Sequence, residues 1–172
     1  SCRPSASPNA APVSEMFRHP AYFLALRGQV VPVLHTYPSL TVWVAGCSTG
    51  EEVFSLAILL REEGLLERTR IYATDINPAS LEKARQGIFP REAVRSYTAN
   101  YQRAGGQLAF SDYYTAAYDA ARFDPSLCAD VTFADHSLAT DSVFAETHLV
   151  SCRNVLIYFN RQLQDRALGL FH

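Results

Sequence analysis

The sequence predicts an α/β fold in which helices cover a mostly parallel sheet. Two strand, helix, strand units follow one another, with buried-strand patterns at Thr41–Ala45 and Arg70–Asp75. A glycine turn joins the first strand to an apolar helix, and 48% of the 172 residues are hydrophobic, enough for a core. Such repeated units are typical of parallel sheets, because each helix returns the chain to the edge where the strands begin.

An N-terminal helical region is expected from Ser14 onward. Ser14 is of a type preferred at helix N-caps, and Pro20 and Pro32 are expected to divide or end the helix. The preceding residues 1–13 are rich in proline and small residues and lack the apolar core of a signal peptide. They are expected to be a disordered linker or a ragged end before a partial domain of residues 14–172.

The remaining elements are marked by cap residues and apolar runs. A helix begins near Glu51 and stops at Gly64, and another starts at Asn77, whose next residue is a proline. Val131–Asp135 and His148–Cys152 have the composition of two further strands. Four parallel strands are therefore expected.

Residues 88–128 interrupt this alternation and are expected to form short helices and loops. Within them the tyrosine-rich segment 97–118 is assigned to local packing, with substrate contact as the minority alternative. A closing helix is expected over Arg161–Phe171.

Charge and hydropathy exclude several classes of partner. The net charge is −2 and the basic residues are scattered, so the basic stripe of a nucleic-acid-binding protein is absent. The apolar run Val53–Leu60 is far shorter than the roughly 20 residues that span a bilayer. The cysteines have no metal-ligand spacing, and they are expected to be reduced thiols in a cytoplasmic protein without a chemical role: Cys2, Cys47, Cys128 and Cys152.

Polar and small residues gather where the predicted strands end. In a parallel sheet these ends share one edge, and ligands bind outside it where the strand order reverses. The residues that follow the four strands are, in order, Gly46, Ser48, Thr49, Gly50 and Glu51; Asp75; Asp135, His136 and Ser137; and Arg153, Asn154 and Tyr158.

The first two of these groups indicate a nucleoside without phosphates. Asp75 follows the glycine turn at about the separation usual for an acid that binds ribose hydroxyls. The turn lacks both the Gly-x-Gly-x-x-Gly pattern and the lysine of a Walker loop, and Glu51 and Glu52 would repel a pyrophosphate. S-adenosylmethionine fits this pattern, whereas ATP and NAD fit poorly. A purely structural alternative is that Asp75 caps the next helix.

Four segments resemble motifs of the CheR-type chemoreceptor glutamate O-methyltransferases. They are Ala45–Glu52, Tyr72–Asn77, Cys152–Phe159 and, before the domain, Ser14–His19. The resemblance implies a Rossmann-like domain that uses S-adenosylmethionine in bacterial chemotaxis or related signalling. The reaction would convert glutamate side chains in the cytoplasmic part of receptors into methyl esters and release S-adenosylhomocysteine.

The resemblance also implies roles for individual residues. Arg18 and Tyr158 would stand near the transferred methyl group as catalytic residues. Those implied to contact the cofactor are Ser14, Arg18, Gly46, Ser48, Thr49, Gly50, Glu51, Asp75, Ser137, Leu138, Arg153 and Asn154. Three positions depart from the family pattern: Ser137 replaces asparagine, Ser14 replaces threonine, and Pro12 replaces asparagine.

A sulfonium methyl group is already activated, so no metal or covalent nucleophile is required, and the gain comes from positioning the acceptor. Glutamate is ionised at neutral pH, so no general base is required either. We expect Arg18 to position the carboxylate and Tyr158 to orient the reacting groups. A core role for the Tyr158 side chain is the alternative.

A second hypothesis is a catalytically silent module that binds S-adenosylmethionine or S-adenosylhomocysteine, or an inactive fragment. Only four strands are predicted, whereas the resemblance implies further C-terminal strands and a basic N-terminal helical domain. The fourth strand would then be an unpaired edge, which favours low stability or an oligomer that covers it. An acceptor other than glutamate is also compatible with the nucleoside site.

Overall fold

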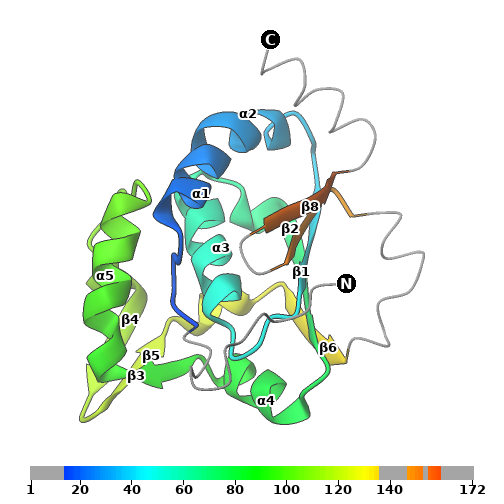
Figure 1. Ribbon diagram of the computed structural model, residues 1–172. Helices are drawn as coiled ribbons and strands as arrows, with labels where there is room; N and C mark the ends of the chain where they lie inside the picture. Colours follow the sequence, from blue (N-terminus) through cyan, green and yellow to red (C-terminus); the bar gives the residue numbers. More distant parts are fainter. Residues whose placement is uncertain (1–13, 136–146, 153–154, 160–172) are drawn as a thin grey trace.

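The computed structural model of the chain describes residues 14–135, 147–152 and 155–159 (Figure 1). The predicted linker 1–13 and the predicted helix Arg161–Phe171 lie outside these residues. The described part contains a five-stranded central sheet, a separate three-stranded sheet and helices packed between and around them. The prediction of an α/β fold with a mostly parallel sheet is confirmed.

The central sheet contains the four predicted strands and one more. In spatial order its strands are β6 (Val131–Asp135), β2 (Thr69–Asp75), β1 (Leu40–Ala45), β7 (Leu149–Cys152) and β8 (Val155–Phe159). The first four run parallel to one another, and β8 runs antiparallel to β7. The chain order of these strands changes direction beside β1, which is therefore the switch point of the sheet.

β8 corrects the expectation that the fourth strand has an unpaired edge. β7 lies between β1 and β8, so both of its edges are paired. The sequence Val155–Phe159 is a run of β-branched, aliphatic and aromatic residues, which favours a strand. Only two residues separate it from β7, too few for a parallel crossover. The argument for an oligomer that covers the edge of β7 therefore loses its basis.

The N-terminal helical region begins later than expected. It consists of α1 (Pro20–Ala25), a π-helical turn η1 (Leu26–Val30) and α2 (Val31–Leu34). Pro20 opens α1, where the missing N–H of proline costs nothing, and Pro32 lies in the first turn of α2, directly after the π-helical turn. The prediction that Ser14 caps this region is wrong, because Pro20 starts the helix and the preceding His19 has a left-handed backbone.

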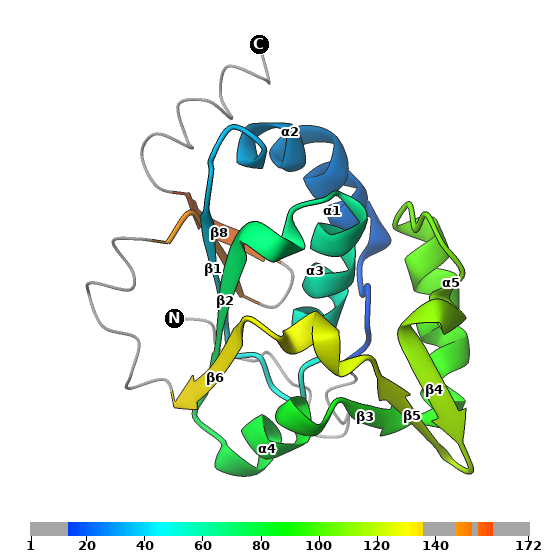
Figure 2. The ribbon, with the colours of Figure 1, turned by 180° about the vertical axis from the view of Figure 1, so that it is seen from behind.

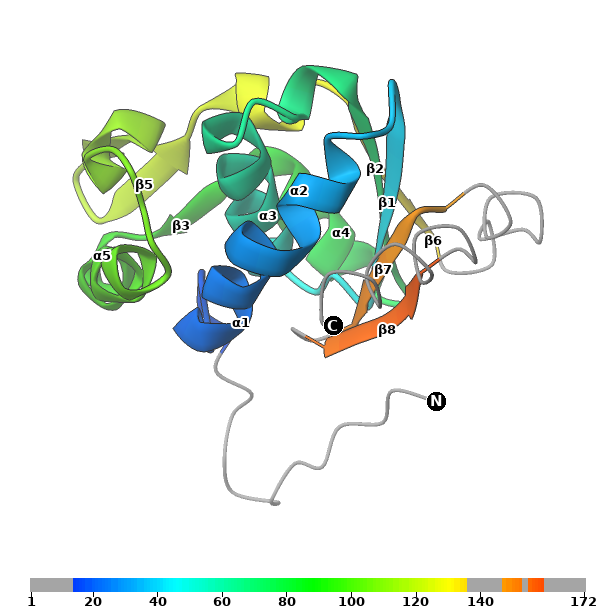
Figure 3. The same ribbon diagram turned by 90° about the horizontal axis from the view of Figure 1, so that it is seen from above.

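α3 (Glu51–Glu62) is the central helix of the molecule. Figure 3 shows it between the central sheet and α5 (Val94–Arg103). Residues 53–60 are each at most 2% exposed, so the helix is buried on every side. Gly64 follows its last turn with a left-handed backbone, as expected for a C-terminal stop.

α4 (Pro78–Gln86) has the predicted cap. The Asn77 side chain accepts hydrogen bonds from the N–H groups of Ala79 at 2.9 Å and Ser80 at 3.3 Å, and Pro78 opens the helix. Gly87 ends it at φ +64°, where an added Cβ would lie 2.9 Å from the Phe54 ring. Phe54 belongs to α3, so this close approach packs the two helices together.

The region expected to hold only short helices and loops contains a second sheet, which corrects the prediction for residues 88–128. Its strands are, in spatial order, β3 (Ile88–Pro90), β5 (Ala120–Phe123) and β4 (Tyr114–Ala117), all antiparallel (Figure 2). Short 3-10 turns complete the chain: η2 (Leu66–Arg68), η3 (Arg91–Ala93), η4 (Phe110–Tyr113) and η5 (Pro125–Cys128). The strands are three or four residues long, and the alanines of β4 and β5 hide the alternation that would identify them.

The tyrosines of this region differ in burial. Tyr97, Tyr101 and Tyr113 are at most 3% exposed and belong to the core, whereas Tyr118 at the β4–β5 turn is 93% exposed. Edge-to-face contacts link the Tyr101 ring to Phe17 at 5.4 Å and to Tyr113 at 6.2 Å. The buried rings thus join the second sheet and α5 to the N-terminal segment.

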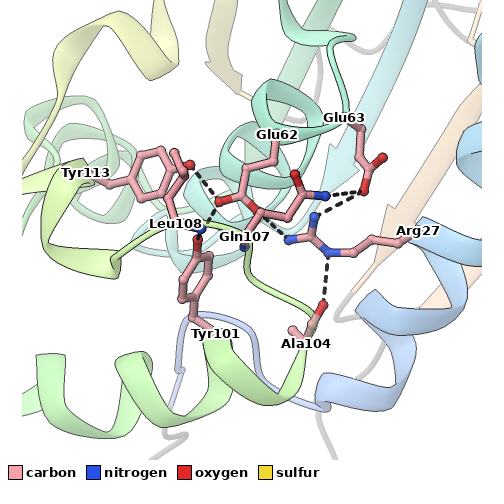
Figure 4. A network of polar contacts seen from close by, with 8 residues as sticks. All are labelled: Arg27, Glu62, Glu63, Tyr101, Ala104, Gln107, Leu108 and Tyr113. Atoms are coloured by element: carbon pink, nitrogen blue, oxygen red, sulfur yellow. Dashed lines mark hydrogen bonds and ion pairs between the residues drawn. The ribbon is translucent and has the colours of Figure 1, made fainter.

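A buried carboxylate fixes the position of α5 (Figure 4). The Glu62 side chain, at the end of α3, is 1% exposed and accepts hydrogen bonds from the hydroxyls of Tyr101 and Tyr113, the latter at 2.6 Å. The Gln107 N–H donates to it at 3.2 Å. Burial, followed by the hydrogen bond to Glu62, raises the pKa of Tyr101 to about 12 and also raises the pKa of Tyr113. Both phenols therefore stay neutral donors at physiological pH.

The cation that balances Glu62 is Arg27 of η1, whose side chain is 8% exposed. Its guanidinium lies 2.9 Å from Glu62 and 3.2 Å from Glu63, and its Nε donates to the Ala104 carbonyl at 2.9 Å. One arginine thus connects the N-terminal helices, α3 and the end of α5.

Replacing Glu62 with Gln should lower the free energy of unfolding by about 3 kcal/mol, because it leaves a buried guanidinium without its main counter-charge. Chemical denaturation measures this change. The control Glu82→Gln breaks the exposed Arg85–Glu82 pair and should cost well under about 1 kcal/mol. Equal effects of the two changes would contradict a special role for the buried pair.

His148 joins the start of β7 to the start of β1. The backbone N–H of His148 donates to the Thr41 carbonyl at 2.9 Å, and the Nδ1 atom of its ring accepts the Thr41 N–H at 3.0 Å. The ring also makes an edge contact with Tyr37 at 4.9 Å. Burial lowers the pKa of His148, so the neutral ring is the form that the fold favours.

The melting temperature should therefore fall on acidification. Because the folded pKa of His148 lies below its unfolded value of about 6.5, this stabilisation is complete above that pH and is lost as the pH falls toward the folded pKa. The variant His148→Asn retains an acceptor but does not titrate, so its melting temperature should depend less on pH between about 7.5 and 5.5. The exposed His35→Asn is the control, and an equally flat profile there would refute the assignment.

Candidate functional site

The turn between β1 and α3 requires glycine at both ends. Gly46 has φ +71° and Gly50 has φ +97°, a region that other residues rarely adopt. At Gly50 an added Cβ would also lie 3.0 Å from the Cβ of Ala84 in α4. The N–H groups of Gly46 and Cys47 both donate to the Thr74 carbonyl, at 2.8 and 2.9 Å. The turn is thereby fastened to the end of β2, one residue before Asp75.

Asp75 holds the turn from the neighbouring strand. Its Oδ2 accepts the Ser48 N–H at 2.9 Å, and its Oδ1 accepts the Asn77 N–H at 2.9 Å. At the start of α4 the N–H groups of Ala79 and Ser80 donate to the Asn77 side chain, so Asn77 and not Asp75 is the cap of that helix. Each carboxylate oxygen retains acceptor capacity, as binding a ribose diol would require.

Glu51 is the buried acid of the site, with 6% of its surface exposed. The Thr49 hydroxyl lies 2.5 and 2.7 Å from its two carboxylate oxygens, and the Ser14 hydroxyl donates to it at 3.0 Å. Ser14 reaches this point from a distant part of the sequence. The structure therefore brings together Ser14, Thr49, Glu51 and, through the turn, Asp75.

Negative charge is concentrated around this turn. Burial, and then the charges of Asp75, Glu51 and Glu52, raise the pKa of the Cys47 thiol to about 12. Carboxylates from α3 and from the end of β2 thus act on the same buried atom. The result also agrees with the prediction that Cys47 is not a nucleophile, because its thiolate is disfavoured.

A second polar chain escaped the sequence analysis. Ser151 of β7 donates to Glu52 at 2.5 Å, and its Oγ lies 2.9 Å from the Tyr22 hydroxyl of α1. Burial raises the pKa of Tyr22, so this hydroxyl stays protonated. In the sequence only Glu52, the second glutamate of the pair, pointed to this contact. Tyr22 and Ser151 are 129 residues apart, so no local pattern links them.

Arg18 is exposed and directly follows two anchored residues. Met16 and Phe17 are completely buried, and both Phe17 and His19 have left-handed backbones. The Phe17 N–H donates to the Ser55 hydroxyl of α3 at 2.9 Å, one helical turn after Glu51. The predicted catalytic arginine is therefore carried by a segment that contacts α3. This is the helix that begins after residues 46–50, the turn that we call the acidic turn because carboxylates surround it.

The remaining predicted site residues are not tested by the structure. Ser137, Leu138, Arg153 and Asn154 lie outside the described residues. Tyr158 lies on β8, where its backbone is paired with Val150, and its side chain is not described. Their roles stay predictions.

The cysteines depart in part from expectation. Cys47 and Cys128 are free thiols, and burial raises the pKa of Cys128 to about 12. Cys152, the last residue of β7, is disulfide-bonded. The prediction of reduced thiols is therefore wrong for Cys152.

Three surface hollows, of about 460, 360 and 590 Å³, lie away from the acidic turn. None of the three is lined by Glu51 or Asp75. The assignment of the site therefore rests on its polar groups and backbone geometry. Within the described residues no set of three His, Cys, Asp or Glu side chains is arranged to hold a metal, and no helix has the length and apolarity to span a membrane.

Comparison with known proteins identifies the family. The profile described as "CheR methyltransferase, SAM binding domain" matches residues 12–172. The chain belongs to this family. It is 71% identical over 161 residues to "Putative methyltransferase Cher3" of Pseudomonas putida, a match that covers 94% of this chain and 59% of that protein.

More distant relatives carry the name "Chemotaxis protein methyltransferase". One from Listeria innocua is 31% identical over 161 residues, covering 92% of this chain and 58% of the relative. One from Escherichia coli is 33% identical over 134 residues, covering 76% and 46%. The chain thus spans about half the length of these relatives, between 46% and 59%.

S-adenosylmethionine is the cofactor of this CheR domain, as the sequence predicts, and the described residues fit it. A buried carboxylate at Glu51 suits a cationic amino group, Asp75 suits the ribose hydroxyls, and Gly46 presents open backbone where a Cβ would meet nothing within 4 Å. When bound, the cofactor supplies a methyl group already activated by its sulfonium.

Replacing Glu51 with Gln should weaken S-adenosylmethionine binding about 10- to 100-fold, because a charge-assisted contact contributes roughly 1.5–3 kcal/mol. The hydroxyls of Ser14 and Thr49 can turn to accept from the new amide, so the melting temperature should change little. Titration calorimetry measures the affinity. The exposed Glu67→Gln should bind like the wild type, and unchanged binding by Glu51→Gln would remove Glu51 from the site.

Proposed function

We propose that this chain transfers the methyl group of S-adenosylmethionine to glutamate side chains in the cytoplasmic part of chemoreceptors or related signalling proteins. The products are glutamyl methyl esters and S-adenosylhomocysteine, and the reaction takes place in the cytoplasm. The names of the relatives support a role in chemotaxis. The acceptor is an ionised carboxylate, so the reaction requires no general base.

The observation that carries this proposal is the placement of Arg18. The acidic turn is negatively charged because Glu51, Glu52 and Asp75 lie around it, and this charge alone would repel a carboxylate substrate. Arg18 is exposed, and its segment touches α3 through both Ser14 and Phe17. Its guanidinium supplies the positive charge and the paired donors that suit a carboxylate.

In the proposed mechanism the chain's own residues bind and align. Asp75 would hold the ribose of the cofactor and Glu51 its amino-acid end. Arg18 would hold the acceptor carboxylate, and Tyr158 would orient the reacting groups with its hydroxyl. Ser48, Thr49 and the glycines shape the turn and Ser14 lies beside it, while Ser137 and Leu138 would border the adenine. Arg153 and Asn154 would line the same pocket. The rate gain then comes from holding the acceptor oxygen in line with the methyl carbon.

The variant Arg18→Ala should reduce methyl transfer at least about 100-fold at saturating cofactor, because the acceptor loses its main contact. Transfer is measured as radiolabel moved from S-adenosylmethionine to receptor fragments and released by alkali, which hydrolyses methyl esters. The exposed Arg95→Ala of α5 is the control. Full transfer by Arg18→Ala would remove Arg18 from the catalytic residues.

The same assay separates the proposed enzyme from a silent binding module. Cofactor affinity by calorimetry without any label transfer in the wild type would favour the silent module or an inactive fragment. Label that resists alkali would indicate an acceptor other than a carboxylate.

A further inference from the structure

The backbone on both sides of Arg18 is held in a conformation that ordinary residues avoid. Phe17 has φ +53° and His19 has φ +60°. A left-handed backbone is unfavourable for side chains with a Cβ, and it persists only where the surroundings impose it. Some contact must therefore fix this segment, which we call the Arg18 segment and define as residues 14–19.

Ser55 makes that contact. It lies on α3 and is completely buried. Its hydroxyl donates to the Glu51 carbonyl at 2.7 Å, and its oxygen accepts the Phe17 N–H at 2.9 Å. The hydroxyl therefore acts as donor and as acceptor at once. One side chain joins the helix that carries Glu51 to the N–H of Phe17, the residue before Arg18.

Other contacts also hold the Arg18 segment, and one of them binds the carbonyl of the same Met16–Phe17 peptide unit. The Phe17 ring packs against Phe23 at 5.0 Å and Tyr101 at 5.4 Å, which secures the side chain. Asn100 of α5 donates to the Met16 carbonyl at 3.2 Å and to Glu15 at 3.1 Å. Of these contacts within the described residues, the one with Ser55 restrains the Phe17 N–H, and a buried N–H without an acceptor is unfavourable.

We propose that Ser55 is a positioning residue for methyl transfer, an inference that rests on the function proposed above. Its hydroxyl holds the Phe17 N–H and so places Arg18 against the acceptor. Ser55 touches neither cofactor nor substrate in this scheme. Without the hydroxyl, the Met16–Phe17 peptide is held at its carbonyl by Asn100 but no longer at its N–H. It tilts about the remaining contact, and the guanidinium of Arg18 is displaced. A displacement of about 1 Å is sufficient to lower a rate about 100-fold.

The first test replaces Ser55 with Ala. The rate kcat should fall about 10- to 100-fold, whereas the Kd for S-adenosylmethionine stays within about 3-fold, because Glu51 and Asp75 are unchanged. The control is Ser96→Ala, an exposed serine of α5 whose hydroxyl also bonds back to a nearby carbonyl, that of Ala93. Transfer by Ser55→Ala at the wild-type rate would overturn the proposal.

Two further variants of similar shape control for the effect of altered core packing on the rate. Thr retains the hydroxyl and Val lacks it, so Ser55→Thr and Ser55→Val disturb the core alike and differ only in the hydrogen bond. Ser55→Thr should transfer at least about 10-fold faster than Ser55→Val. Equal rates in the two variants would mean that the hydroxyl has only a structural role.

A double variant tests whether Ser55 acts through Arg18. The variant Ser55→Ala/Arg18→Ala should be no slower than Arg18→Ala alone, because the residue being positioned is already absent. Additive losses would overturn the proposal. This comparison is made at saturating cofactor, so a change in affinity does not contribute.

Amide hydrogen exchange examines the contact independently of activity. Peptides that contain residues 14–19 should exchange at least about 10-fold faster in Ser55→Val than in Ser55→Thr, since the Phe17 N–H loses its acceptor. Unchanged exchange would overturn the positioning role even if transfer falls. If the wild type transfers no methyl group while the exchange difference is present, the proposed function fails and the contact between Ser55 and Phe17 stands.

Discussion

The close contact between Gly50 and Ala84 constrains the whole site. A side chain at Gly50 would meet α4 at 3.0 Å, and its φ of +97° already excludes most other residues. The glycine lets α3 begin immediately after the turn, while two N–H groups of that turn share the Thr74 carbonyl. As a result, the first residue of α3 and the last residue of β2 lie at the same edge of the sheet, where the parallel strands end. Glu51 and Asp75 can then serve one ligand.

α3 connects the chemistry to the rest of the molecule. Its first turn carries Glu51, its second turn carries Ser55, and its last turn carries Glu62. Each of these side chains bonds to a residue far away in the sequence. Because the helix is buried on every side, its polar groups must be satisfied by such contacts. The N-terminal segment and α5 are therefore both attached to this one helix, which also bonds to the central sheet through Glu52 and Ser151.

The division of charge around the site suits the proposed reaction. Carboxylates surround the turn proposed to bind the cationic cofactor, and Arg18 lies on the segment that contacts the same helix. An acidic turn alone would select the cofactor but repel a glutamate acceptor. The N-terminal segment therefore complements the family's nucleotide-binding fold with the opposite charge. Membership of the CheR family accounts for the cofactor, and the geometry around Arg18 supports the acceptor.

The sequence by itself determined the four parallel strands, the glycine turn and the acids at the strand ends, because each depends on local patterns of two to ten residues. It also indicated the cofactor, through Glu51 and Asp75. Only the tertiary structure revealed that Ser14 bonds to Glu51 rather than capping a helix, that β8 pairs with β7, and that residues 88–123 contribute a second sheet. These features depend on contacts between residues far apart in the chain, and such contacts leave no periodic signal in a single sequence.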